Sequence, residues 1–180
     1  GVRHERGLRE LEKEDAQLFI ICLNPLFPDK TLYRDGASFV TYEYERPFPH
    51  AKSLNMLQSY LAYKKAKEAG CDDSRLVNKD GCITEGTRTN FLAVKGNVIY
   101  SPLEKDIMLG VGRKYVLETA KENGFTVEER NIPKDSLNEY DGAFLTSTSS
   151  KIMPIKRVDD FEFEKIPDSI FRLIDLFSKR

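Results

Sequence analysis

The sequence predicts a mixed α+β fold, in which hairpins and helices share one chain without a regular βαβ series. Two tight-turn signals, Asp80-Gly81 and Gly96-Asn97, each lie between short apolar runs, which is typical of antiparallel hairpins. Other segments space their apolar residues as helices do, and one of them ends at Asn123-Gly124. A chain of 180 residues is long enough for one such domain.

The composition excludes several classes of protein. The chain is 40% hydrophobic and 32% charged, which is ordinary for a globular domain, and its net charge of −1 offers no basic field for nucleic acid. Cys22, Cys71 and Cys82 are scattered without a CxxC pair, so we expect neither a disulfide framework nor a metal site. No signal peptide or membrane-length apolar run appears, and we expect a cytoplasmic protein that binds no membrane.

The first third of the chain predicts two strands and a helix. The continuous apolar run 18–23 is expected to be a buried strand. Residues 37–46 alternate apolar and polar side chains over much of their length, as a half-buried strand does. Residues 53–69 have a helical period, with Ser53 as a candidate N-cap and Gly70 as the residue that ends the helix.

The remaining two thirds predict short strands first and helices later. A helix opened by residues 110–113 should run to Asn123-Gly124, a short helix should follow Pro133, and residues 166–177 have helical spacing. The predicted strands are 75–78, 82–84, 90–94, 98–100, 125–130, 142–146 and 152–158.

Lys52 lies at the junction between the extended run and the predicted helix at 53–69. An ammonium group close to a helix N-terminus is disfavoured by the helix dipole, so we expect its pKa to fall. A lowered pKa suits a lysine that acts as an amine nucleophile or proton carrier. The alternative from these residues alone is a solvated surface lysine beside a helix.

Three further segments combine chemically useful groups at the junctions of elements. Residues 84–90 place Glu85 between a strand and a polar turn that contains glycine. Residues 110–113 open a helix with two glycines, where backbone N–H groups can approach a phosphate. Residues 146–150 are five consecutive hydroxyl side chains, which can bind a phosphate or a carboxylate. Taken singly, they are also explained as a surface turn, an ordinary helix start and a polar loop.

Together, the lysine, the carboxylate, the helix N-terminus and the hydroxyls are the parts that a pyridoxal phosphate enzyme needs. The order of the motifs over residues 39–159 resembles the fold-type IV pyridoxal phosphate family, which contains branched-chain aminotransferases, D-amino acid aminotransferases and aminodeoxychorismate lyases. The matching motifs are Lys52-Ser53-Leu54-Asn55, Thr84-Glu85-Gly86 followed by Asn90-Phe91, Met108-Leu109-Gly110-Val111-Gly112-Arg113, and residues 144–150 followed by Ile152 and Pro154.

The resemblance implies a role for each matching residue. Lys52 would form the Schiff base and move the substrate proton, and Glu85 would pair with the pyridine nitrogen. Arg46 resembles a family arginine near the cofactor, although a surface charge at a strand end explains it equally well. The other implied contacts are Leu109 on the ring face, the N–H groups of Val111 and Gly112 and the hydroxyl of Thr148 on the phosphate, and Ser149 and Ser150 at the substrate carboxylate. Gly112 departs from the threonine usual in the family.

The resemblance also implies an activity and a domain organisation. The expected activity is a pyridoxal phosphate-dependent aminotransferase that moves an amino group between an amino acid, branched-chain-like or D-, and a 2-oxo acid such as 2-oxoglutarate, in a homodimer. The alternatives are an aminodeoxychorismate lyase and a non-catalytic cofactor-binding relative. Residues 17–180 would be the large cofactor-binding domain, a mixed sheet or pseudo-barrel with flanking helices. Residues 1–16 would be a remnant of the interdomain connection, and the N-terminal small domain would be absent.

Overall fold

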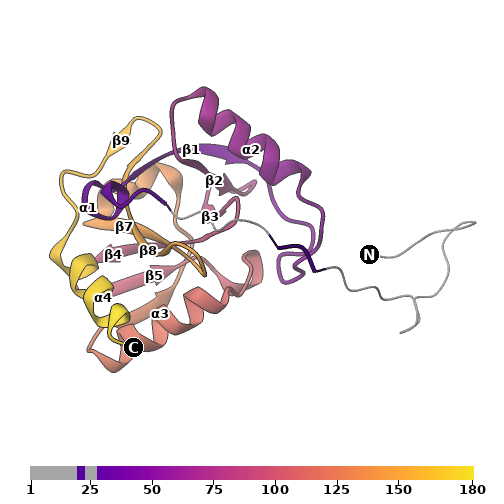
Figure 1. The fold of residues 1–180 in the computed structure, drawn as a ribbon. Helices are drawn as coiled ribbons and strands as arrows, with labels where there is room; N and C mark the ends of the chain where they lie inside the picture. Colours follow the sequence, from indigo (N-terminus) through magenta and orange to yellow (C-terminus); the bar gives the residue numbers. More distant parts are fainter. Residues whose placement is uncertain (1–19, 23–27) are drawn as a thin grey trace, which may run out of the picture.

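The computed structural model describes residues 20–22 and 28–180 (Figure 1). The predicted interdomain remnant 1–16 lies outside these residues. Of the predicted buried strand 18–23, only 20–22 are described, and this prediction is wrong for them: they are irregular, and Ile20 is 82% exposed. An apolar run shows only a tendency to be buried, because it does not identify a strand with which it could pair.

Within the described residues, nine strands form one mixed sheet, and six of these strands close into a barrel. The order around the barrel is β3-β2-β1-β8-β7-β4, and β3 closes it by pairing with β4. Strand β1 is parallel to both β2 and β8, and the other barrel pairs are antiparallel. The barrel strands are β1 (Ala37–Glu43), β2 (Asp73–Val77), β3 (Ile83–Gly86), β4 (Asn90–Lys95), β7 (Gly142–Ser147) and β8 (Lys151–Val158). The predicted pseudo-barrel is confirmed.

The other three strands extend the barrel. Strand β5 (Val98–Ser101) pairs with the C-terminal half of β4, and β6 (Thr126–Glu129) adds to it in parallel. Strand β9 (Phe161–Glu162) pairs with β8. Strand β4 therefore contacts β3 at its first residue and β5 at its end, so the barrel and its extension share one strand.

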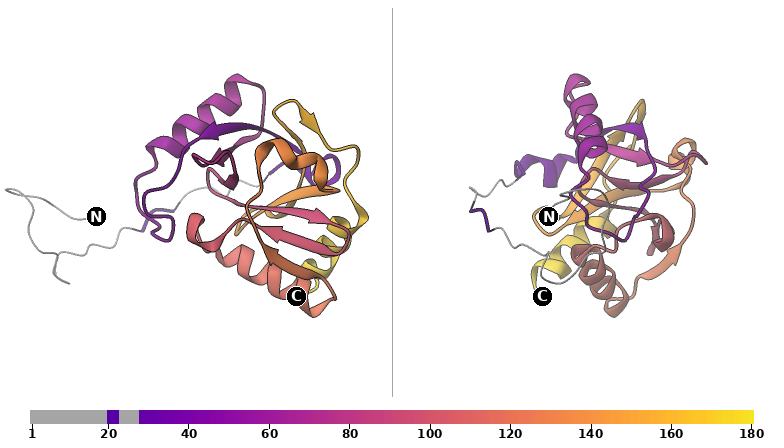
Figure 2. Two further views of the ribbon diagram at one scale, coloured as in Figure 1. Left: turned by 180° about the vertical axis from the view of Figure 1, so that it is seen from behind. Right: turned by 90° about the vertical axis from the view of Figure 1, so that its right-hand side faces the viewer.

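Helices cover opposite ends of the molecule (Figure 2). Helix α2 (Leu57–Glu68) packs on β1 and β2, whereas α3 (Val111–Glu122) packs on β7, β6 and α4 (Asp168–Ser178). The short helix α1 (Thr31–Asp35) lies against β8. Two 3-10 helices, η2 (Glu104–Asp106) and η3 (Lys134–Glu139), precede α3 and β7.

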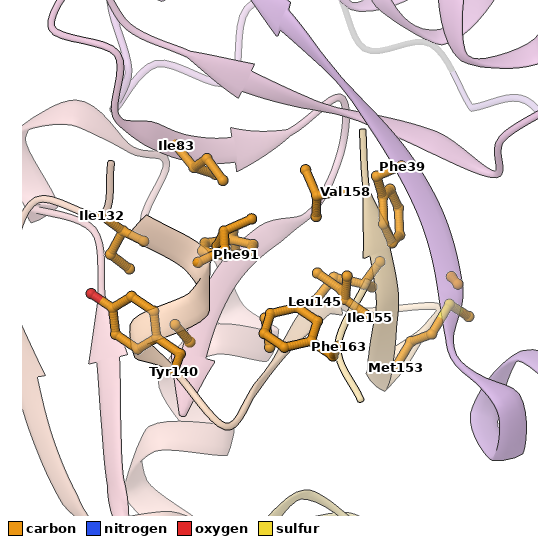
Figure 3. Packing of buried hydrophobic residues seen from close by; sticks show 14 of the residues in the cluster. Phe39, Ile83, Phe91, Ile132, Tyr140, Leu145, Met153, Ile155, Val158 and Phe163 are labelled. Carbon is orange, nitrogen blue, oxygen red and sulfur yellow. The ribbon is translucent and has the colours of Figure 1, made fainter. Parts of the chain in front are cut away.

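The strand period of two separates the buried side chains of β4 and β7 into two clusters. Phe91 of β4 and Leu145 of β7 belong to a cluster that draws residues from all six barrel strands (Figure 3). The intervening Leu92 and Phe144 point to the other side of the sheet, where α3 and α4 cover them. Strand β4 is buried on both faces, which explains its continuous apolar run. Truncating a fully buried phenylalanine such as Phe91 to alanine would cost about 3–5 kcal/mol.

The two predicted hairpins are confirmed as the antiparallel pairs β2–β3 and β4–β5. The helix predicted from Ser53 is wrong in its start, because α2 begins at Leu57 and Met56 is its N-cap. Upstream of α2, the N–H of Ser53 donates to Ala51 and the N–H of Met56 donates to Leu54. These bonds span two residues, as in γ-turns, and not the four of an α-helix.

Two strand boundaries also differ from their predictions. Strand β1 ends at Glu43, short of the predicted residue 46. Glu85 lies inside β3 and not beyond it, since its backbone pairs with Leu76 of β2 and with Asn90 of β4. A strand prediction from side-chain alternation cannot detect these ladder partners, because they come from distant parts of the chain.

Candidate active site

The four predicted segments meet around one cavity of about 590 Å³. It is bounded by the irregular segment 46–56, the turn after β3, the approach to α3 and the end of β7. Of the predicted site residues, those that line the cavity are Arg46, Lys52, Glu85, Leu109, Val111, Gly112 and Thr148. Ser149 and Ser150 follow Thr148 in the β7–β8 turn and are not among the residues that line it.

Glu85 is the buried acid of the cavity, only 3% exposed. Its Oε2 accepts the backbone N–H of Met108 at 3.2 Å, and its Oε1 lies 2.5 Å from Nε of Arg46. This ion pair lacks hydrogen-bond geometry, and Oε1 accepts no hydrogen bond from the described part of the chain. Burial raises the pKa of Glu85, while Arg46 and the Met108 N–H act in the opposite direction. A cationic N–H donor placed in the cavity would therefore stabilise the carboxylate.

Arg46 belongs to the cavity and not to the surface. Its side chain is 13% exposed, and besides pairing with Glu85 it donates from Nη2 to the carbonyl of Thr87 at 3.3 Å. It thereby ties the segment that follows β1 to the turn that follows β3. The interpretation of Arg46 as a solvated charge at a strand end is wrong.

Lys52 lines the same cavity, but its side chain is exposed and its backbone is irregular. Because α2 begins only at Leu57, Lys52 is not at a helix N-terminus, and the predicted influence of the helix dipole does not apply to it. The segment is held instead by His50, whose Nε2 lies 2.8 Å from the carbonyl of Glu104. A carbonyl only accepts, so Nε2 is the donor in this bond. The sequence carried no signal for this role of His50.

The N-terminus of α3 lines the same cavity and has the form of an anion cradle. Gly110 is its N-cap, and the N–H groups of the first helical residues, Val111 and Gly112, have no partner within the helix. Asn90 holds the approach by donating from Nδ2 to the carbonyl of Met108 at 2.7 Å. A Cβ atom at Gly110 would lie 2.2 Å from Oδ1 of Asn90, so the close approach requires glycine.

Gly112 lets the same helix lie close to the end of β7. A Cβ atom there would be 3.0 Å from the backbone carbon of Ser147 and 3.1 Å from Oγ1 of Thr146. The Thr146 hydroxyl is buried and has no hydrogen-bond partner in the described residues. Gly112, which stands where threonine is usual in the family, thus allows the tight packing of α3 on β7. The unpartnered hydroxyl of Thr146 lies next to it.

Arg113, the last residue of the motif 108–113, is structural. It is 6% exposed and donates from Nε and Nη2 to the hydroxyl of Ser101, and from Nη1 to the carboxylate of Glu104. Because Glu104 also accepts the bond from His50, this network links the first turn of α3 to the segment that carries Lys52.

These groups fit pyridoxal phosphate. The cavity combines a lysine amine, a buried carboxylate oxygen without a hydrogen-bond donor, an exposed apolar Leu109 and a glycine-opened helix N-terminus. Among residues 20–22 and 28–180, no three His, Cys, Asp or Glu side chains are grouped as a metal site requires. In the same part of the chain, no helix has the length and apolar character needed to cross a bilayer.

The chain is similar to known proteins over much of its length. The family described as Amino-transferase class IV matches residues 3–158. The chain is 39% identical over 109 residues to a D-alanine aminotransferase of Bacillus licheniformis, covering 60% of this chain and 38% of that protein. It is 32% identical over 124 residues to a branched-chain-amino-acid aminotransferase of Pseudomonas aeruginosa, covering 68% of this chain and 40% of that protein. The chain thus spans less than half the length of these relatives.

Solved structures show the same fold. A branched-chain amino acid aminotransferase of T.th., solved with pyridoxamine 5′-phosphate, superposes with a TM-score of 0.77 at 26% identity, over 86% of this chain and 53% of that one. A Legionella pneumophila protein assigned as a 4-amino-4-deoxychorismate lyase superposes with a TM-score of 0.74 at 26% identity, over 79% of this chain and 55% of that one.

Proposed function

The chain belongs to the fold-type IV family of class IV aminotransferases, and from this membership we propose that it forms the cofactor-binding part of a pyridoxal phosphate-dependent aminotransferase. Its substrates would be an amino acid, branched-chain-like or D-, and a 2-oxo acid such as 2-oxoglutarate. One observation carries the proposal: the residues Lys52, Glu85 and Gly112, which come from three distant segments, line a single cavity.

Each side chain has a separate task in this proposal. The Lys52 amine would attach the cofactor and, once displaced by the substrate amine, would take the proton from the substrate α-carbon and return it. Glu85 would pair through its carboxylate with the protonated pyridine nitrogen, whose cationic N–H would stabilise this buried group in addition to Arg46. When bound, pyridoxal phosphate supplies an electron sink for the carbanion at that α-carbon.

The remaining residues would bind and orient. The N–H groups of Val111 and Gly112 and the Thr148 hydroxyl would hold the phosphate, as the positive end of α3 favours. Leu109, which is 49% exposed, offers an apolar surface for the ring face. Ser149 and Ser150 would contact the substrate carboxylate from the β7–β8 turn, which the hydroxyl of Ser147 braces by accepting the N–H of Ser150.

A second candidate is an aminodeoxychorismate lyase. The Legionella pneumophila structure assigned to that activity shares the fold, and elimination of pyruvate would use the same lysine and carboxylate. The two activities differ in their products, because transamination yields a new amino acid whereas the lyase releases pyruvate.

The experiment offers the protein D-alanine or a branched-chain L-amino acid together with 2-oxoglutarate, and separately offers aminodeoxychorismate. We expect glutamate from the first mixtures. Pyruvate from aminodeoxychorismate without glutamate formation would assign the lyase activity instead. A protein that binds pyridoxal phosphate but makes neither product would be a non-catalytic relative, and failure to bind the cofactor would contradict the proposal altogether.

We also propose that the protein works as a cytoplasmic homodimer. Apolar side chains gather beside the cavity on the Lys52 segment and the start of α2, and four are largely exposed: Phe48 by 76%, Leu54 by 88%, Leu57 by 62% and Tyr60 by 62%. Exposed apolar patches of this kind usually contact another protein surface. Light scattering coupled to size exclusion should give twice the mass of one chain, and a monomer would contradict this assembly.

A further inference from the structure

Two threonines in the turn after β3 face the cavity with opposite hydrogen-bond polarity. Thr87 and Thr89 both line it, one on each side of Arg88. The Thr87 hydroxyl donates to Oδ1 of Asp73 at 2.7 Å, whereas the Thr89 hydroxyl oxygen accepts from Nη1 of Arg75 at 2.9 Å. A guanidinium has donors only, so Thr89 must be the acceptor in its bond. Both polarities are thus set by residues of β2.

Arg75 is an unusual residue to find beneath this turn. It is 0% exposed, and its guanidinium carbon lies 3.8 Å from the centre of the Phe39 ring. Its Nε and Nη2 have no partner in the described residues. A Cβ atom on Gly86 would lie 2.0 Å from Nη1, so glycine at that position makes the space for the guanidinium.

Packing alone does not account for Arg75. A buried cation with unused donors costs free energy, and an apolar side chain of similar volume would usually be at least as stable. Burial lowers the pKa of Arg75 to about 10, which still leaves it charged at neutral pH. The one hydrogen bond that its guanidinium makes to residues 20–22 and 28–180 goes to Thr89, a residue of the cavity wall.

The consequence falls on the Thr89 proton. Its oxygen is occupied by Arg75, and its O–H finds no acceptor in the described residues, while the residue is partly exposed and lines the cavity. A hydroxyl that accepts from a cation is also a stronger donor, because hydrogen bonds in a chain polarise one another. Thr87, whose proton goes to Asp73, has only lone pairs left to offer.

We propose that Arg75 is a positioning residue that fixes Thr89 as a donor to an anionic oxygen of the bound cofactor. The inference rests on the proposed function. It adds that Arg75, which is buried in β2, acts on the cofactor through Thr89. The anionic oxygens available are those of the phosphate and the phenolate oxygen of the pyridine ring.

A double-mutant cycle tests this coupling. The affinity of the chain for pyridoxal 5′-phosphate is measured by equilibrium titration of cofactor absorbance for wild type, Arg75→Met, Thr89→Val and the double variant. We expect each single variant to bind about tenfold more weakly, and the double variant to bind no more weakly than Thr89→Val. Arg75→Lys and Thr89→Ser, which keep the donors, should restore most of the affinity. Repeating the titration with pyridoxal identifies the phosphate if the loss disappears, and the phenolate oxygen if it persists.

A second arginine–threonine pair provides the matched control. Arg180 donates from Nη1 to Oγ1 of Thr119 at 3.0 Å, and neither residue lines the cavity. Thr119→Val should therefore leave the cofactor affinity unchanged. Additive losses in the cycle, or a Thr89→Val variant that binds like wild type, would overturn the inference while leaving the proposed function intact. A wild-type chain that binds no cofactor would overturn both. If Arg75→Met does not fold, the contrast between Thr89→Ser and Thr89→Val decides alone.

Discussion

The two chemical groups that matter most in the cavity are held in contrasting ways. Glu85 is built into the barrel: it is 3% exposed, its backbone is paired on both sides, and its position follows from the sheet. Lys52 stands on an irregular, exposed segment that is attached to the rest by the side chains of Arg46 and His50. The contrast teaches that the acid is preorganised by folding, whereas the lysine depends on a few hydrogen bonds and on whatever binds beside it.

Of the substitutions considered, removal of the Lys52 side chain should have the largest effect on activity. In the proposed function Lys52 attaches the cofactor and carries the proton, so Lys52→Ala should lower transamination by about 10²–10⁴-fold or more. The melting temperature of the cofactor-free chain should hardly change, because the side chain is exposed. Steady-state kinetics and thermal unfolding measure the two effects. A large loss of stability would mean that the Lys52 segment is part of the core.

The N-terminus of α3 is held in place by folding, as Glu85 is. A substitution there should therefore reduce cofactor affinity and stability together. Gly110→Ala places a Cβ atom 2.2 Å from Oδ1 of Asn90, which must move and release the Met108 carbonyl. We expect cofactor affinity to fall about tenfold and the free energy of unfolding to fall by about 1–3 kcal/mol. Titration with pyridoxal 5′-phosphate and urea unfolding check this, and wild-type values in both would contradict the described packing.

Loss of the hydrogen bond between His50 and Glu104, which holds the Lys52 segment, should reduce cofactor affinity by less and leave stability nearly unchanged. His50→Ala removes the hydrogen bond to Glu104, worth about 1 kcal/mol, and loosens the segment without touching the barrel. We expect cofactor affinity to fall about three- to fivefold with little change in urea unfolding. His50→Gln, which keeps an N–H donor, is the matched control. Equal affinities for His50→Ala and wild type would show that this hydrogen bond does not position Lys52.

The pH dependence of the cofactor-free chain tests the burial of Glu85. Burial raises its pKa in the folded chain above the ordinary value of 4.5, so the folded state holds the proton more tightly than the unfolded state does. The stabilisation is present below pH 4.5 and is lost as pH rises through the raised pKa. The free energy of unfolding of wild type relative to Glu85→Gln should therefore fall between pH 4 and neutrality. A rise over that range would mean that pairing with Arg46 outweighs burial.

Turn residues and the spacing of apolar side chains predicted those features of the fold that depend on neighbouring residues in the sequence. The hairpins at Gly81 and Gly96 were predictable because their glycines adopt positive φ angles that other residues avoid. The start of α3 was predictable from the glycines at 110 and 112. The helix start was misplaced because Leu54, which fits the helical period, is 88% exposed and outside the helix. Periodicity cannot tell an apolar residue that faces a core from one that faces a site or partner.

The features that sequence reasoning missed depend on contacts between distant residues. His50 contacts the carbonyl of Glu104 across 54 positions, and Asn90 holds Met108 across 18. Arg75 reads as one polar residue in a strand until the barrel closes and places it beneath the turn at Thr89. No spacing rule connects such pairs, because the sheet order brings them together.

The central claim is that Lys52 is the residue that attaches pyridoxal phosphate. The most direct measurement incubates the chain with the cofactor, reduces the lysine–cofactor bond with borohydride, and locates the label by peptide mass mapping. The account predicts one pyridoxyl group, on the peptide that contains Lys52, and no label in Lys52→Ala. A label on a different lysine, or none at all, would contradict it.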